Sequence, residues 1–172
     1  ISTRTQATYD EEHVSDATPE DLDKESLEDY IKKLKKIRPH ARYLNQPFEQ
    51  ILLQLKILRK VNKNLYPTIA GLLMFGNYPQ SFEPQLVITF LQYYGTTETE
   101  TTPRGERFLD NRKFEGTIPE MVESTVNHIM ASIRKSSLIE GLWRRDIPEY
   151  PEEAVREAIV NAVAHRDYSH FV

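Results

Sequence analysis

Apolar residues recur at helical spacing in several parts of this sequence, and a run of β-branched and aromatic residues stands between them. Spacings of three and four residues place side chains on one helix face, whereas β-branched and aromatic residues favour strands. The helical patterns cover residues 27–37, 48–58, 121–133 and 154–163, and the strand-like run covers residues 86–94. The sequence therefore predicts an α+β or α/β fold, in which a small mixed sheet packs with several helices.

The first 20 residues lack this periodicity. They are polar and include Asp10, Glu11 and Glu12, so we interpret residues 1–20 as a linker or an arm from an upstream domain. Thr18 and the Pro-Glu-Asp sequence after it then predict a helix start, because threonine caps helices and proline suits their first turn. The apolar face of this helix consists of Leu27, Tyr30, Ile31, Leu34 and Ile37.

The opposite face of the same helix is basic. It continues past the helix, and the cations are Lys32, Lys33, Lys35, Lys36, Arg38, His40 and Arg42. Clustered cations bind phosphates, but they also form the solvated face of many amphipathic helices, and we favour the solvated face. The formal net charge of −4 excludes a wholly basic nucleic-acid-binding surface, so any phosphate contact is local.

Two more helices are expected before the strand-like run. The first covers residues 47–61, and the second is a short buried helix that Thr68 caps and Gly76 ends. A helix-turn-helix is disfavoured, because the second helix presents almost no polar side chains to base edges. Residues 86–94 are expected as a central strand. A second strand, a long helix and an extended segment follow over residues 107–114, 117–133 and 142–150.

The last helical pattern opens at Pro151 and carries a polar stripe. Glu157, Asn161 and His165 recur every four residues beside the apolar face, and four residues turn a helix only about 40° past a full circle. A carboxylate one turn before a carboxamide suits nucleotide chemistry, since the acid can orient a water and the amide oxygen can ligate Mg²⁺. A polar helix edge without a ligand is the alternative, and it is favoured by the spacing alone.

The sequence E-A-I-V-N-A-V-A-H-R-D-Y over residues 157–168 resembles the N-box helix of a GHKL ATPase subgroup, and Tyr150 and Pro151, which precede it, are part of the resemblance. This subgroup occurs in bacterial AlbA-type (schlafen-like) transcriptional regulators and in RecG-related ATP-dependent DNA helicases. Residues 68–80, and the Phe-Glu-Gly sequence over residues 114–116 with the helix after it, resemble the middle region of the same proteins. The resemblance spans the chain from about residue 18 onward.

This resemblance implies an order of domains, from an AlbA-like nucleic-acid-binding domain through a middle region to a GHKL ATPase domain. Residues 21–149 would then be the middle α/β domain, and residues 150–172 the first helix of the ATPase domain. The chain would be an internal fragment that links the nucleic-acid-binding domain to the ATPase domain, with DNA bound through other domains. A non-enzymatic scaffold or dimerisation module without nucleotide binding is the alternative.

The resemblance also assigns roles to residues. Glu157 resembles the water-activating acid and Asn161 the Mg²⁺ ligand, with His165, Arg166 and Asp167 near the nucleotide or structuring the helix end. ATP and Mg²⁺ are therefore the expected cofactors of the full-length protein. A GHKL site also needs a later aspartate and glycine-rich segments, which the 172 residues lack, so the chain alone is expected neither to bind nor to hydrolyse ATP.

Two other interpretations of the final motif are weaker. The His-Arg-Asp sequence over residues 165–167 occurs in protein-kinase catalytic loops, but those need an asparagine five residues later, where this chain has Val172. We reject the kinase interpretation. His165, Asp167 and His170 are metal-ligand types, yet a helix end that displays them to solvent is the commoner explanation, and we favour it.

Composition gives the expected location. Cysteine is absent, which removes disulfides and thiolate metal sites and is compatible with a reducing compartment, so a cytoplasmic location is predicted. No apolar run approaches the ~20 residues that cross a bilayer, so no membrane partner is expected. A homo-oligomer stays open as an alternative.

Overall fold

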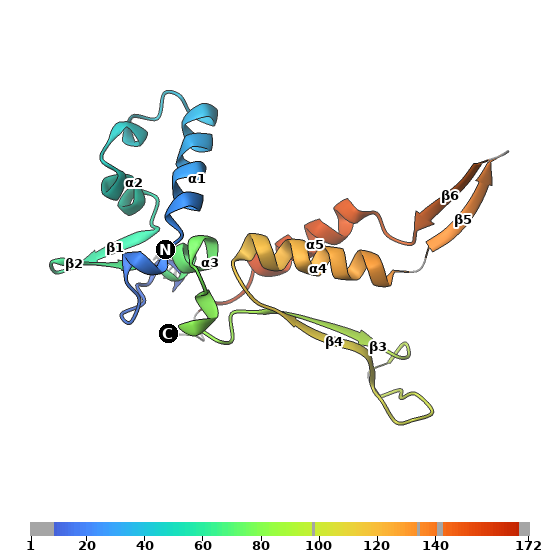
Figure 1. Cartoon of the computed structure of the whole chain (residues 1–172). Coiled ribbons are helices and arrows are strands. Elements are labelled where there is room, and N and C mark those ends of the chain that lie inside the picture. The colour runs from blue at the N-terminus through green and yellow to red at the C-terminus, as the bar shows by residue number, and fades with distance from the viewer. Residues whose placement is uncertain (1–8, 98, 134, 141–142, 169–172) are drawn as a thin grey trace, which may run out of the picture. The chain divides into compact units, whose positions relative to one another are not determined.

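A computed structural model of the chain describes residues 9–97, 99–133, 135–140 and 143–168. The chain divides into two compact units, one of residues 1–86 with 167–172 and one of residues 87–166. The α+β class is confirmed, because helices combine with antiparallel strands (Figure 1). The small sheet is not mixed, however. The described strands form three separate antiparallel pairs, each joining neighbours in the chain.

The first unit contains α-helices, short 3-10 helices and one β-hairpin. Its α-helices are α1 (Lys24–Ile37), α2 (Phe48–Gln54) and α3 (Ile69–Phe75). Its strands are β1 (Leu58–Val61) and β2 (Asn64–Pro67). The 3-10 helices are η1 (Tyr9–Glu11), η2 (Pro19–Asp21), η3 (Arg42–Asn45) and η4 (Pro79–Ser81).

Residues 9–20, expected as part of an arm, instead pack into this unit. Ala17 is fully buried in its hydrophobic core. The Val14 amide donates to the Pro67 carbonyl over 2.9 Å, and the Ile69 amide donates to the Glu12 carbonyl over 3.0 Å. These main-chain hydrogen bonds tie the segment to β2 and to the start of α3. The polar composition of the segment did not predict this packing. Residues 1–8 lie outside the described part of the chain.

The predicted amphipathic helix is present as α1, but it begins later than Thr18. Thr18 caps the 3-10 helix η2, and α1 begins at Lys24, where the Asp23 side chain accepts from the Glu25 amide over 3.0 Å. Leu27 and Ile31 are buried, as the spacing predicts. Ile37, expected on the same face, is 74% exposed because it occupies the last turn.

The helix predicted over residues 47–61 is too long. α2 ends at Gln54, and Lys56 then adopts the left-handed conformation, with a φ of 59°, that commonly follows a helix end. Residues 58–61 form β1, which pairs with β2 across a two-residue turn that contains Asn62 at a φ of 56°. Leu58 was expected at the end of the helix, but it begins β1 and is buried in the hydrophobic core.

The short helix α3 is confirmed with its cap. The Thr68 hydroxyl accepts from the Gly71 amide over 2.9 Å and donates to the Lys56 carbonyl over 2.7 Å. Gly71 packs against the chain before β1, since a Cβ atom there would lie 2.2 Å from the Ile57 carbonyl oxygen. Only glycine therefore allows α3 to approach this backbone so closely.

The second unit contains two long helices and two hairpins. Its elements are β3 (Ile88–Tyr93), β4 (Phe108–Phe114), α4 (Ile118–Ser132), β5 (Lys135–Glu140), β6 (Trp143–Pro148) and α5 (Glu152–Ala164). Within the described residues β3 pairs with β4 alone, so it is not the central strand that its composition suggests. The strand β5 was not predicted from the sequence. Thr117 and Glu120 form the capping box that starts α4.

A charged and aromatic cluster holds β4 against α4. His128 on α4 hydrogen-bonds the Asp110 carboxylate, and its ring packs on Phe90 and Phe114 with centroid separations of 5.4 and 5.6 Å. The second ring nitrogen of His128 lies 3.3 Å from Arg112. Met121, Val122, Thr125 and Val126 are the buried residues of α4.

Candidate functional site

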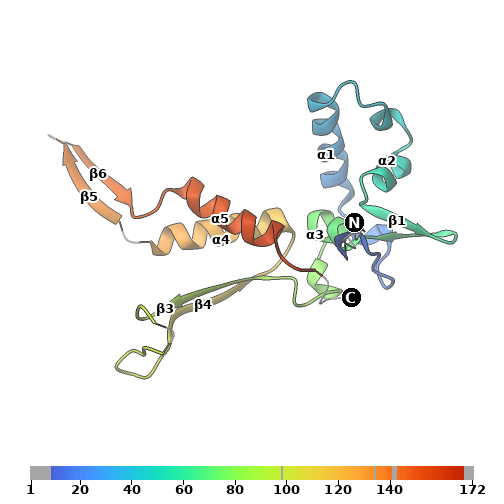
Figure 2. The ribbon, with the colours of Figure 1, turned by 180° about the vertical axis from the view of Figure 1, so that it is seen from behind.

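The helix α5 lies beside α4 in both views of the second unit (Figures 1 and 2). Arg156 joins the two helices, because its guanidinium lies 2.7 Å from Glu123 on α4 and 3.1 Å from Glu152 on α5. Hydrogen bonding to Arg156 lowers the pKa of Glu123. The spacing of Glu152 and Arg156 is readable from sequence as an i, i+4 pair, but the partner on α4 is not.

The apolar face predicted for α5 is only partly covered. Val155, Ile159 and Val163 are partly buried, and no residue of α5 is fully buried. The alanines of the predicted face are exposed, at positions 154, 158 and 162. The helix therefore sits on the edge of this unit.

The predicted polar stripe occupies an open edge of α5. Glu157 and Asn161 are both exposed and stand one helical turn apart. In the described part of the chain, neither side chain has a hydrogen-bond or ion-pair partner. His165 follows as the C-cap residue and is also exposed. The structure thus brings the carboxylate and the carboxamide onto one edge, where an external ligand can reach both.

The two residues after His165 are placed differently. Arg166 is partly buried, and its guanidinium donates to the Val87 carbonyl over 3.0 Å. This bond ties the end of α5 to the residue before β3, and the role of Arg166 near a nucleotide stays a prediction. Asp167 is exposed just beyond the helix. His170, the third residue of the weighed metal cluster, lies outside the described residues.

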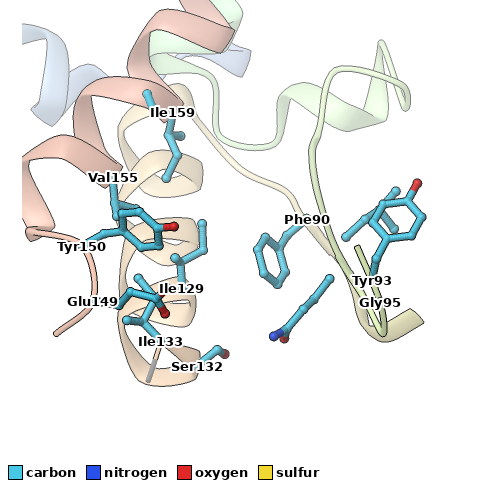
Figure 3. A pocket seen from close by; sticks show the side chains of 13 residues that line it. Phe90, Tyr93, Gly95, Ile129, Ser132, Ile133, Glu149, Tyr150, Val155 and Ile159 are labelled. Atoms are coloured by element: carbon cyan, nitrogen blue, oxygen red, sulfur yellow. The ribbon is translucent and has the colours of Figure 1, made fainter. Parts of the chain in front are cut away.

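A separate apolar groove lies between β3 and the two helices, with a volume of about 630 Å³ (Figure 3). Phe90 points from β3 toward Ile129 on α4, and Val155 and Ile159 come from α5. Glu157 and Asn161 are not among its lining residues. This groove and the predicted polar site are therefore on different parts of α5.

The described residues supply only part of the ligand set that a metal ion needs. The described residues contain no group of three or more His, Asp or Glu side chains that could hold a metal ion. Asn161 offers one oxygen, which suits Mg²⁺ that is also bound by phosphates rather than by a protein cage. Over the same part of the chain, no helix is long and apolar enough to span a bilayer.

Comparison with known proteins identifies the first half of the chain. Residues 1–86 match the family described as a domain of unknown function, DUF8451, and this match covers half of the 172 residues. The chain belongs to the DUF8451 family. The DUF8451 region ends at Leu86, which is also where the main segment of the first unit ends. No match was found among curated proteins or solved structures.

The DUF8451 region contains one of the two notable polar surfaces of the chain but not the other. It contains α1 with its basic face, whereas α5 and the Glu157–Asn161 edge lie outside it. Residues 87–149 are the second part of the predicted middle domain, and they lie in the same unit as α5. The predicted boundary between a middle domain and an ATPase domain stays a prediction.

Proposed function

We propose that this chain connects a nucleic-acid-binding domain to a GHKL-type ATPase, in a bacterial transcriptional regulator or a RecG-related ATP-dependent DNA helicase. The observation that carries the proposal is the open edge of α5, where Glu157 and Asn161 are exposed one turn apart. This placement is what the resemblance to an N-box helix requires. A cytoplasmic location is part of the proposal.

The two side chains have complementary chemistry. The amide oxygen of Asn161 would hold Mg²⁺, and the carboxylate of Glu157 would orient the attacking water and accept its proton. When bound, Mg²⁺ would neutralise charge on the phosphates. The contacts to adenine and the closure over the phosphates belong, in this proposal, to segments beyond the 172 residues, so the chain alone does not hydrolyse ATP.

A scaffold or dimerisation module without nucleotide binding is the second candidate. It is favoured by the exposed apolar side of α5, where Val160 is 44% exposed and the alanines at 154, 158 and 162 lie open. A protein partner would remove this surface from water. Nucleotide binding distinguishes the two candidates.

We expect Asn161→Ala to weaken Mg²⁺-dependent ATP binding to the full-length protein by at least about tenfold, because it removes a metal ligand. Calorimetric titration with and without Mg²⁺ measures this change. Asn127→Ala, at an exposed position of α4, is the matched control and should leave the affinity unchanged. Equal affinities of the Asn161→Ala protein and wild type would reject the nucleotide site, and no binding by wild type would favour the scaffold.

A further inference from the structure

The second half of α1 and the turn after it expose a cluster of cations, which we call the basic face. Every member is exposed. The residues are Lys32, Lys33, Lys35, Lys36, Arg38, His40 and Arg42. The overall charge of −4 makes this concentration a local feature of the first unit.

The helix geometry directs the four lysines away from the core. Leu27 and Ile31 bury the opposite side of α1. Residues at 32, 33, 35 and 36 all fall on the other side, and they span only about 6 Å along the axis, at about 1.5 Å per residue. Four ammonium groups therefore project from little more than one helical turn.

Acidic residues on α1 are segregated from this cluster. Glu25, Glu28 and Asp29 occupy its first half. Lys32 pairs with Asp29 over 3.0 Å, and this contact raises the pKa of Lys32. In the part of the chain that the structure describes, the other six cations have no acidic side chain within 4.0 Å. The charge of the lysines and arginines among them is thus not neutralised by the protein.

The turn after α1 holds the remaining cations in place. The Arg38 amide donates to the Leu34 carbonyl over 2.8 Å, and the Ala41 amide donates to the Arg38 carbonyl over 3.1 Å. Leu44, only 1% exposed, anchors the turn to the core. Arg38, His40 and Arg42 therefore extend the basic face on an ordered backbone, so binding would have to order their side chains but not the chain that carries them.

The sequence alone favours a solvated face, but the lack of acidic partners, among the described residues, for six of its seven side chains points further. We propose that the basic face of α1 binds the phosphate backbone of duplex DNA without reading its sequence. Lysine and arginine neutralise phosphates, and no Asn or Gln stands among residues 32–42 to pair with adenine edges. A lipid surface is disfavoured, because the apolar side of α1 lies in the core and Ile37 is its one exposed large apolar residue in the described chain. This site lies in the DUF8451 region and does not rest on the proposed ATPase role of α5.

Fluorescence anisotropy with the 172-residue chain and a labelled 30-base-pair duplex of mixed sequence tests the proposal. If the five lysines and arginines of the face that lack an acidic partner in the described chain each release a counterion, log Kd should rise with log salt with a slope of about 4.5, or about 500-fold weaker binding between 50 and 200 mM. Lys33→Gln with Lys36→Gln should lower the slope by about 1.8 and weaken binding at 50 mM by at least about tenfold. Circular dichroism confirms that the variant is folded.

The matched control is Lys60→Gln with Lys63→Gln, which removes the same charge from exposed positions of the β1–β2 hairpin. It should change affinity by less than about twofold. Equal losses in both variants, or no duplex binding at 50 mM salt, would overturn the proposal. Tight, salt-tolerant binding to one sequence would do the same. So would binding to vesicles of anionic phospholipid that exceeds duplex binding and disappears in the Lys33, Lys36 variant.

Discussion

Replacement of Glu157 by alanine is expected to lower ATP turnover by the full-length protein about 10²–10⁴-fold, which is the usual contribution of a positioned general base. Nucleotide affinity should stay within about twofold of wild type, because Asn161 and not Glu157 is the proposed Mg²⁺ ligand. The helix should remain folded, since Glu157 is exposed and alanine favours helix. Phosphate release and nucleotide binding, measured on the same preparation, separate the two effects.

The control for this variant is Glu153→Ala. Glu153 is an exposed glutamate one turn earlier on α5, so the substitution removes the same charge from the same helix. Turnover by the Glu153→Ala protein should match wild type. If a folded Glu157→Ala protein hydrolyses ATP at the wild-type rate, the stripe of Glu157, Asn161 and His165 is a polar helix edge without a ligand.

Replacement of Gly71 by alanine is expected to destabilise the first unit by about 2–3 kcal/mol, at the upper end of overpacking effects. The added Cβ atom would lie 2.2 Å from the Ile57 carbonyl oxygen and 3.1 Å from the Thr68 hydroxyl. This carbonyl also accepts from the Thr68 amide over 3.0 Å, so moving it disturbs the cap of α3. The cost should exceed the small helix-propensity gain of alanine.

Urea unfolding of the 172-residue chain, followed by circular dichroism, measures this loss. Met74→Ala is the control, because Met74 is on the same helix and 37% exposed. It should cost less than about 1 kcal/mol. A Gly71→Ala protein as stable as wild type would mean that α3 does not approach the backbone before β1 as closely as described.

Local signals predicted much of the fold. The helices α1, α4 and α5 follow from apolar spacing, and α3 follows from its Thr68 cap and its end at Gly76. The Thr68 cap and the Thr117 start were readable because capping depends on nearby residues. The hairpin β1–β2 was missed, because Leu58 continues the helical spacing of α2. The left-handed turn at Lys56 and burial against the core determine the strand, and neither is visible in the periodicity.

The candidate site, like the fold, could be predicted only in part from the sequence. That Glu157 and Asn161 share one edge follows from the helical repeat alone. How much of α5 is covered depends on α4, so the exposed alanines and the Arg156–Glu123 ion pair were not predictable from spacing. The contact of Arg166 with the Val87 carbonyl joins residues 79 positions apart in the sequence, and no local pattern announces it.

Hydrogen exchange of the full-length protein, compared with and without Mg²⁺-ATP, tests the nucleotide site most directly. If α5 borders the bound nucleotide, amides of residues 152–164 should exchange more slowly in its presence, while α1 over residues 24–37 should be unaffected. The same protection should be absent in the Asn161→Ala protein. Nucleotide binding that slows exchange elsewhere and leaves α5 unchanged would contradict the assignment of Glu157 and Asn161 to an ATP site.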